Sequence, residues 1–260
     1  MSVITSSLPK RALGSTGLQV SCLGLGTVKF GRNQGVKYPS GFELPHDNQI
    51  RELLALSRSL GINLIDTAPA YGSSEERLGK LLTNRHEWVI CSKTGEEFVN
   101  GQSHFDFSAK HTRFSIERSL RRLNTDYIDL VLVHSDGNDE HIIRQTDCFE
   151  TLDRLKHEGL IRAFGLSGKT VAGGLLALEY SDAVMVTFNL TEQSEREVIQ
   201  RAHELNKAVL IKKAFNSGHS ASPEDSLRLV LTEPGVSSVI VGTINPQHLQ
   251  SNVIAASYIQ

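Results

Sequence analysis

Cysteine is scarce in this sequence of 260 residues, which contains only Cys22, Cys91 and Cys148. The three residues lie far apart and show none of the spacings typical of a metal site or a redox pair. An odd and sparse set of thiols is typical of proteins from a reducing compartment. Cys91 lies within an apolar run, where we expect a small buried residue. The sequence therefore predicts no bound metal and a cytoplasmic location.

Long apolar runs are also missing. No uninterrupted run approaches the roughly 20 residues that a membrane-spanning helix needs. Residues 1–11 lack the apolar core of a signal peptide. We therefore expect neither a membrane anchor nor secretion.

An excess of charge of one sign is the third missing feature. Lys and Arg number 27 against 29 for Asp and Glu, which gives a formal net charge of −2. This balance does not indicate nucleic acid or an anionic membrane as a partner. The local group Arg118, Arg121 and Arg122 has no interleaved aromatic residues and is interpreted as a solvated helix face. A small molecule is the expected partner, and a monomer is the expected state.

Linkers, low-complexity segments and internal boundaries are absent too, so we interpret residues 1–260 as a single domain with ample length for a core.

Glycines at 14 and 17 separate two short runs, 11–13 and 18–20, and this pattern predicts a β-hairpin. After it, short apolar strands alternate with amphipathic helices. The predicted strands are 23–26, 63–66, 88–93, 127–134, 161–167, 183–187, 208–213 and 238–241. The predicted helices are 48–60, 75–82, 109–123, 147–157, 172–178, 192–205, 223–231 and one from 246 onward, and 28–47 and 95–108 are predicted loops.

Several of these helices have recognisable start signals. Ser73 with Glu76 three residues later fits a capping box, so a helix is expected near residue 74. Ser222 precedes a proline and is expected to cap the next-to-last helix. Asn245 and Pro246 open the last helix, whose N-terminus is expected to favour an anion.

Eight strand–helix units within about 240 residues are typical of an α/β protein with a (β/α)8 TIM barrel, here preceded by an N-terminal β-hairpin. A doubly wound sheet is the alternative. Such a sheet usually shows an early phosphate-binding glycine fingerprint, and the segment from Gly24 to Gly26 lacks the third glycine. The barrel is therefore the favoured fold.

In a barrel, catalytic side chains lie at the C-terminal ends of the strands. The second, third and fourth predicted strands end at Asp66, Lys93 and His134, and Tyr71 follows the second. Taken singly, each of these residues also fits a purely structural role. Their joint placement at one end of three adjacent strands is what indicates a site.

These four residue types suit a reduction that is coupled to proton transfer. A phenol with a pKa near 10 is a weak acid, and a neighbouring ammonium such as Lys93 lowers that pKa. Burial tends to discharge a lysine, whereas a carboxylate such as Asp66 keeps it protonated. His134 can hydrogen-bond a carbonyl oxygen and orient it. Tyr71 would then protonate that oxygen as hydride reaches the carbon.

With these four residues and their surroundings, the sequence resembles the aldo-keto reductase superfamily, and the resemblance extends over essentially its whole length. The resemblance rests on the segments 13–27, 66–72, 92–94, 129–134, 161–167 and 239–243. It implies a TIM barrel that reduces an aldehyde or ketone to an alcohol with NAD(P)H, NADP(H) being favoured and NAD(H) remaining open. It also implies the catalytic tetrad Asp66, Tyr71, Lys93 and His134.

The resemblance further implies cofactor contacts. They are Thr27, Asp66, Ser167, Lys212, Gly242 and Asn252. Three positions depart from the family pattern, since Gly168 replaces an Asn, Met185 a Gln and Lys212 a Tyr that stacks on the nicotinamide. Ile244 stands where many NADP-preferring members have an Arg, and Lys212 or Lys213 is an alternative phosphate contact.

Two other functions remain open. The departures at Gly168, Met185 and Lys212 allow a nucleotide-binding regulatory or sensor protein on the same barrel, although the intact tetrad argues against it. A metal-dependent hydrolase lacks a ligand set, because His134 is alone at its strand end. Substrate choice depends on the loops 28–47 and 95–108 and on the C-terminal tail. Because the sequence ends soon after the last helix, we expect an open, permissive pocket.

Overall fold

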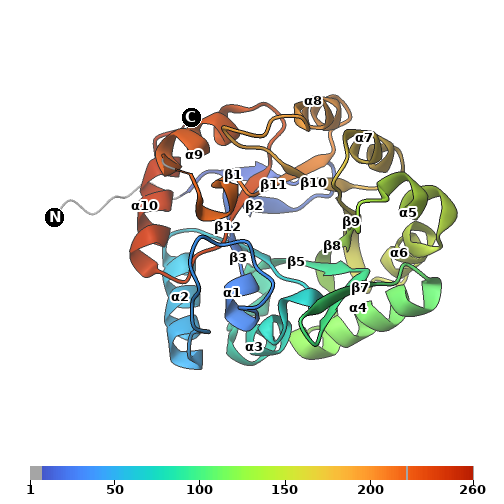
Figure 1. Cartoon of the computed structure of the whole chain (residues 1–260), viewed down its shortest axis with the longest axis horizontal. Helices are drawn as coiled ribbons and strands as arrows, with labels where there is room; N and C mark the ends of the chain where they lie inside the picture. Colours follow the sequence, from blue (N-terminus) through green and yellow to red (C-terminus); the bar gives the residue numbers. More distant parts are fainter. Residues whose placement is uncertain (1–7, 221, 260) are drawn as a thin grey trace.

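A closed barrel of eight parallel strands forms the centre of the computed structural model, which describes residues 8–220 and 222–259 (Figure 1). Residues 1–7 of the segment considered for a signal peptide therefore lie outside the described residues. Around the barrel the strand order is β10-β11-β12-β3-β4-β5-β8-β9. The bounds are β3 (Leu23–Gly26), β4 (Leu64–Asp66), β5 (Val89–Thr94), β8 (Ile128–His134), β9 (Ile161–Ser167), β10 (Ala183–Thr187), β11 (Ala208–Lys212) and β12 (Ser238–Val241). The predicted TIM barrel is confirmed.

The N-terminal hairpin is confirmed as well. Its strands β1 (Lys10–Ala12) and β2 (Gln19–Ser21) pair antiparallel, with Arg11 opposite Val20. Leu13 and Val20 are fully buried and pack with the apolar residues inside the barrel. A Cβ at Gly14 would lie 2.5 Å from the backbone nitrogen of Ala208, so only glycine fits where the hairpin meets β11. The hairpin therefore closes the N-terminal end of the barrel.

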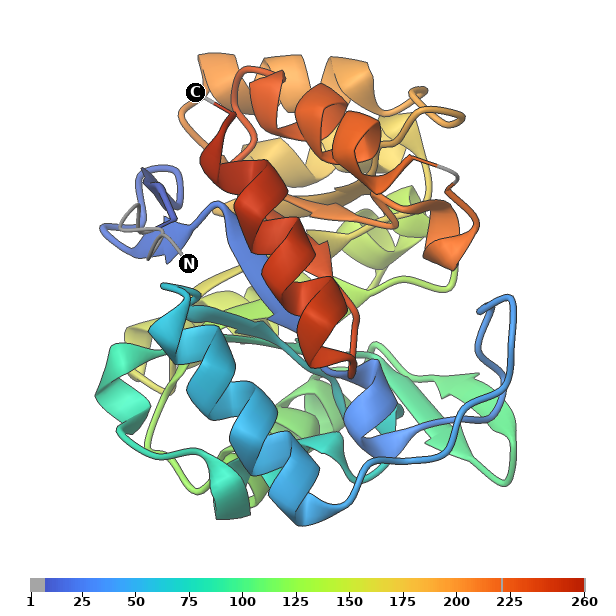
Figure 2. The same ribbon diagram turned by 90° about the vertical axis from the view of Figure 1, so that its left-hand side faces the viewer.

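Helices surround the strands, and Figure 2 shows α10 lying across the side of the barrel above α2. The main helices are α2 (Asp47–Ser59), α3 (Ser74–Leu81), α4 (Ala109–Leu123), α6 (Cys148–His157), α7 (Val171–Tyr180), α8 (Arg196–Glu204), α9 (Pro223–Thr232) and α10 (Pro246–Ser257). Each corresponds to a predicted helix within a few residues. None of the helices in the described residues is long and apolar enough to cross a membrane.

The alternation of side chains along the strands explains where the site forms. In β8, Leu130 and Leu132 belong to the apolar cluster inside the barrel, whereas Val131 and Val133 pack against the helices. Successive side chains of a strand point to opposite faces, so the residue at the end of β8, His134, shares the inner face. The same parity relates Leu64 to the last residue of β4 and Cys91 to the penultimate residue of β5. Asp66, Lys93 and His134 therefore all occupy inner-face positions at the C-terminal mouth.

Both segments that were predicted to be loops contain regular secondary structure, and the connection that follows β8 contains an unpredicted helix. Residues 28–47 contain the short helix α1 (Val28–Gly31), and residues 95–108 contain the hairpin of β6 (Glu96–Val99) and β7 (Gln102–Phe105). Helix α5 (Asp139–Gln145) also went unpredicted. Strand β7 is exposed throughout and shows no apolar alternation, so hydrophobic periodicity cannot reveal it. Its turn, Asn100-Gly101 with φ values of 52° and 81°, is nevertheless the standard hairpin signal.

The predicted helix starts are partly confirmed. Ser222 accepts a hydrogen bond from the amide of Asp225, and the side chain of Asn245 caps α10. Helix α3 begins at Ser74 as expected, but the predicted capping box is wrong because Ser73 makes no side-chain cap. Its neighbour Ser74 instead turns inward and bonds the buried hydroxyl groups of Thr67 and Thr27.

The solvated-face interpretation of the arginines on α4 is wrong for two of the three. Arg118 pairs with Glu97 of β6, and Arg122 lies 3.2 Å from a carboxylate oxygen of Glu76. Both arginines are largely covered. They join α4 to neighbouring elements, and of the three arginines Arg121 alone is exposed.

Candidate active site

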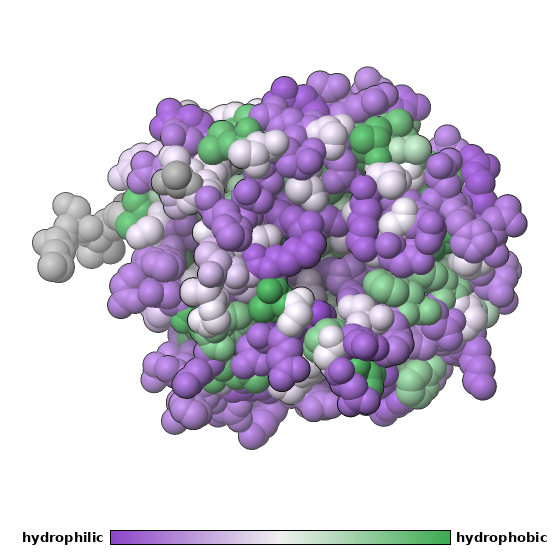
Figure 3. Space-filling model, viewed as in Figure 1, coloured by the Kyte–Doolittle hydropathy of each residue, from purple (hydrophilic) through white to green (hydrophobic). Residues whose placement is uncertain are grey.

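A cavity of about 1280 Å³ lies at the C-terminal ends of the strands. Figure 3 shows its opening near the middle of this face, bordered mainly by hydrophilic residues. The loop 32–46 and the β6–β7 hairpin stand side by side at its edge (Figure 2). They are joined by the guanidinium of Arg32, which lies 3.4 Å from the ring centroid of Phe98.

The most deeply buried charges of the cavity are Lys93 and Asp66. The ammonium of Lys93 donates to Asp66 Oδ1 at 2.5 Å and to the carbonyl oxygen of Thr67 at 2.9 Å. Lys93 is only 1% exposed to solvent, and Asp66 is only 4% exposed. Burial by itself lowers the pKa of Lys93, but the nearby Asp66 and Tyr71 together raise it above the usual value. The lysine therefore stays protonated.

Tyr71 lies beside this pair. It ends a single 3₁₀ turn, Pro69–Tyr71, and its ring centroid is 4.8 Å from the ammonium of Lys93. Burial raises the pKa of Tyr71 more than the charge of Lys93 lowers it, so the phenol is a weaker acid than the sequence predicted. Gly31 and Gly72 fix this turn, because a Cβ at either one would lie within 2.5 Å of backbone atoms of the other segment.

His134 faces Tyr71 edge to face, with 6.4 Å between the ring centroids. Its Nδ1 atom lies 2.6 Å from Oε2 of Glu96, the first residue of β6. Glu96 also accepts a hydrogen bond from the hydroxyl of Ser103 on β7 at 2.6 Å and lies 3.8 Å from Arg32. The sequence reasoning missed this carboxylate, and the Asn-Gly turn of the hairpin was the signal that could have drawn attention to it.

The electrostatics of the Glu96–His134 contact favour an ionised carboxylate. Burial raises the pKa of Glu96, but His134, Ser103 and Arg32 outweigh it and lower the value to about 2. Burial lowers the pKa of His134, while Glu96 opposes that change. Lys93 and Lys212 also lower it by charge repulsion. The carboxylate is thus the principal group that favours a proton on this imidazole.

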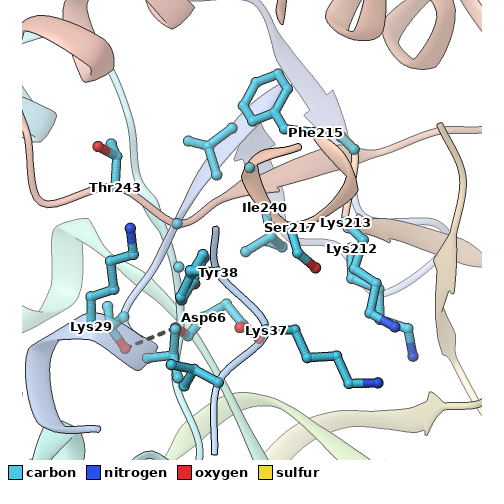
Figure 4. A pocket seen from close by; sticks show the side chains of 18 of the residues that line it. Lys29, Lys37, Tyr38, Asp66, Lys212, Lys213, Phe215, Ser217, Ile240 and Thr243 are labelled. Carbon is cyan, nitrogen blue, oxygen red and sulfur yellow. Dashed lines mark hydrogen bonds between the residues drawn. The ribbon is translucent and has the colours of Figure 1, made fainter. Parts of the chain in front are cut away.

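Tyr38, from the loop 32–46, is a second phenol in the cavity (Figure 4). Its hydroxyl lies 3.2 Å from the position that a Cβ on Gly242 would take, and the ammonium of Lys29 lies 4.0 Å from its ring centroid. Burial and the charge of Asp66 raise the pKa of Tyr38 to about 12. The loop thereby crosses from α1 to the end of β12, and no sequence pattern predicted this contact.

The predicted cofactor residues line the same cavity as the tetrad; they are Thr27, Asp66, Ser167, Lys212, Gly242 and Asn252. Thr27 is buried, and its hydroxyl donates to the carbonyl oxygen of Asp66 at 2.9 Å. The cavity runs without a break from these strand ends to Asn252 on α10. Its volume and its mixture of cationic, hydroxyl and amide groups fit a dinucleotide.

Two of the three departures from the family pattern, Lys212 and Gly168, are explained by their surroundings in the structure. Lys212 donates to Ser167 Oγ at 3.1 Å and to the carbonyl oxygen of Gly168 at 2.6 Å. Burial is the main cause that lowers the pKa of Lys212 to about 8. A Cβ at Gly168 would lie 3.1 Å from a carboxylate oxygen of Asp139, which also accepts from the amides of the two following residues. Asp139 therefore leaves little room for the family's Asn.

The N-terminus of α10 differs from the expectation that its amides would bind an anion. Asn245 Oδ1 accepts from the amides of Gln247 and His248, and the carbonyl oxygen of Asn245 accepts from Leu249. Pro246 has no amide hydrogen. Every amide of this first turn is therefore already used, and an anion would depend on side chains or on displacing Asn245.

In the described part of the chain, no group of three His, Cys, Asp or Glu side chains is placed to hold a metal ion. The three cysteines are buried free thiols.

Comparison with known proteins gives consistent results. The sequence model of the Aldo/keto reductase family matches residues 22–221. An uncharacterized oxidoreductase of Bacillus subtilis, YqkF, is 26% identical over 95% of this chain and 91% of its own length. L-galactose dehydrogenase of Arabidopsis thaliana is 37% identical over 61% of this chain, but that match covers only 48% of the plant protein.

Solved structures agree. A Pseudomonas aeruginosa protein, provisionally described as an aldo-keto reductase, is 58% identical with a TM-score of 0.92 and coverage of 99% and 98% of the two chains. The holo form of the aldo-keto reductase AKR11C1 from Bacillus halodurans is 25% identical, with a TM-score of 0.81 and coverage of 95% and 90%. These relatives support an oxidoreductase that acts on carbonyl compounds.

Proposed function

The chain belongs to the aldo/keto reductase family, and from this premise we propose that it reduces an aldehyde or ketone to an alcohol with NADPH. The observation that carries the proposal is the buried Lys93–Asp66 pair beside Tyr71 and His134 at the mouth of the barrel. When bound, the reduced nicotinamide would supply a hydride to the carbonyl carbon.

Tyr71 is the proposed proton donor. Its raised pKa keeps the phenol protonated at neutral pH, so that it holds a proton to deliver. Transfer of this proton would leave a phenolate, which the ammonium of Lys93, 4.8 Å from the centroid of the ring, would stabilise. Asp66 keeps Lys93 charged throughout and is therefore a supporting group.

His134 is proposed to orient the substrate. Its ring borders the cavity opposite Tyr71, where it can hydrogen-bond the carbonyl oxygen and direct that atom toward the phenol. The proposed cofactor contacts are Thr27, Asp66, Ser167, Lys212, Gly242 and Asn252, all of which line the cavity. NADP(H) is proposed over NAD(H) on the basis of the family resemblance.

The test replaces only the phenolic hydroxyl. Tyr71→Phe should reduce turnover of a panel of small carbonyls, followed by NADPH absorbance, to background, because no proton donor remains. Fluorescence titration should show nearly unchanged NADPH binding. Full activity in this variant would refute the assignment of the acid.

A regulatory or sensor protein on the same barrel is the second candidate. Lys212 favours it, because its ammonium already engages Ser167 and Gly168, where the resemblance places the carboxamide of the nicotinamide. Tight NADPH binding without turnover of any carbonyl would support this alternative over the reductase.

Further expectations concern the domain organisation, oligomeric state, location and partners of the protein. We propose a single domain over residues 1–260, a monomer and a cytoplasmic location, with a small-molecule carbonyl substrate and no nucleic acid or membrane partner. The sparse cysteines support the reducing compartment. Size-exclusion chromatography with light scattering would test the monomer.

A further inference from the structure

Three exposed lysines border the cavity, and the charges of Lys37 and Lys169 are near enough to Lys213 to lower its pKa; we call Lys37, Lys169 and Lys213 the lysine cluster. They come from the loop 32–46, from the residues after β9 and from the residue after β11. Three segments far apart in the sequence thus each contribute a cation to the lining of one cavity. Figure 4 shows the side chains of Lys37 and Lys213 reaching the same side of the cavity as Lys212.

The charges of the lysine cluster are not neutralised by ion pairs. Within residues 8–220 and 222–259, the lysines that form ion pairs are Lys80, Lys93 and Lys156. Burial lowers the pKa of Lys213, and so do the ammonium groups of Lys37 and Lys169, while Glu192 and Glu195 oppose them only weakly. The cluster is therefore a region of like-charge repulsion that an anion would relieve.

The lysine cluster lines the same cavity as Tyr71 and His134. Lys212 connects the two regions, since its pKa is lowered chiefly by burial but also by the charges of Lys213 on one side and Lys93 on the other. The charge of Lys212 in turn reaches His134. An anion held by the cluster would therefore lie in the cavity that also contains Tyr71 and His134.

A different lysine suits the phosphates of the cofactor. In Figure 4 the ammonium of Lys29 points toward Thr243, at the end of β12, away from Lys37 and Lys213. Thr243 and Asn252 both line the cavity, and the dinucleotide is proposed to extend toward them. The side chains of Lys37 and Lys213 reach the opposite side of the cavity (Figure 4). Phe105 of β7 is an apolar residue of the lining, and its ring centroid lies 5.8 Å from the ammonium of Lys169.

We propose that the physiological substrate carries an anionic group, a carboxylate, phosphate or sulfonate, in addition to its carbonyl, and that the lysine cluster binds this group. The inference rests on the proposed reductase function and narrows it. Binding the anion there fixes the carbonyl near Tyr71, so the anionic group should raise kcat/KM through positioning as well as attraction.

The first experiment compares two aldehydes that differ only in charge, 4-carboxybenzaldehyde and methyl 4-formylbenzoate, at low ionic strength with saturating NADPH. We expect kcat/KM to be at least about tenfold higher for the carboxylate, with the preference shrinking as salt is raised. Including 4-formylphenyl phosphate distinguishes a carboxylate from a phosphate preference. Equal rates, or faster reduction of the ester, would overturn the inference while leaving the reductase function intact.

The second experiment uses Lys37→Met, Lys169→Met and Lys213→Met, with Lys110→Met, an exposed lysine of α4 outside the cavity lining, as the matched control. Each cluster variant should lower the carboxylate-to-ester ratio several-fold, and the control should not. The NADPH Kd should stay within about twofold. Weaker NADPH binding with an unchanged ratio would assign these lysines to the cofactor and refute the proposal.

Binding gives a readout that does not depend on turnover. Calorimetry with NADP⁺-loaded protein should detect 4-(hydroxymethyl)benzoate but not its methyl ester, and the cluster variants should lose the difference. If neither aldehyde is reduced but this binding difference is seen, the reductase proposal fails and the anion site stands. If carbonyls are reduced without any binding difference, the anion site fails alone.

Discussion

At the scale of single residues, Glu96 is the carboxylate of the site that the sequence did not predict. It contributes a carboxylate 2.6 Å from Nδ1 of His134, and the hydroxyl of Ser103 and the guanidinium of Arg32 hold it there. Its neighbour Glu97 points elsewhere and pairs with Arg118 and His111. Two adjacent carboxylates thus have different surroundings, which makes them a matched pair for mutagenesis.

Glu96→Gln should lower the pKa of His134, because it removes the negative charge that favours the protonated ring. The imidazolium should then be lost at a lower pH than in the parent protein, and any limb of the kcat/KM profile that follows it should move the same way. NMR titration of the His134 ring gives the direct measurement. Glu97→Gln is the control, and an unchanged His134 titration in Glu96→Gln would contradict the expectation.

Glu96 also links stability to pH. Its pKa falls from an ordinary carboxyl value to about 2 in the folded protein, so it stabilises the fold above about pH 4.5. That contribution is lost progressively as the pH falls toward 2. In urea titrations, the difference in stability between the parent and Glu96→Gln should therefore shrink on acidification.

At the scale of elements, the β6–β7 hairpin depends on its turn. Gly101 has φ of 81°, and no atom lies within 4 Å of the place where its Cβ would be. Gly17, in the hairpin at the other end of the barrel, has φ of 79° and equally open space. Alanine at either position would be strained by its backbone alone, which makes the two glycines directly comparable.

Gly101→Ala and Gly17→Ala should each lower the free energy of unfolding by about 1 kcal/mol, measured in urea. Only Gly101→Ala should also lower kcat/KM, because it loosens the strand that carries Glu96 against His134. A loss of activity that is equal in both variants would mean that the hairpin has no specific part in the site.

At the scale of the whole molecule, stability comes from two apolar layers on either side of the barrel wall. Leu130 is fully buried inside the barrel with the hairpin residues Leu13 and Val20, whereas Val131 packs toward the helices. The inner layer is enclosed by the strands and the N-terminal hairpin, so it has few ways to collapse around a missing side chain.

Leu130→Ala should therefore lower the free energy of unfolding by about 2–5 kcal/mol in urea denaturation. Leu205→Ala, at a position 36% exposed, is the control and should change it by no more than about 0.5 kcal/mol. Comparable losses in the two variants would show that the inner layer is not the dominant core.

The sequence by itself determined the barrel and the positions of Asp66, Lys93 and His134 at the ends of its strands, with Tyr71 in the turn beyond β4. The reason is local: apolar residues that alternate along each strand fix which face each side chain occupies, so Leu130 and Leu132 place His134 on the inner face. The Asn-Gly turn shows that even the missed hairpin left a local signal.

Only the tertiary structure decided which distant segments meet. Closure of the barrel and packing of its loops bring Glu96 against His134, Tyr38 against Gly242 and Lys37 near Lys213. They also raise the pKa of Tyr71, because burial outweighs the neighbouring charge of Lys93. Such contacts join residues that share no sequence period, and desolvation depends on everything that covers a side chain, so neither can be read from local spacing.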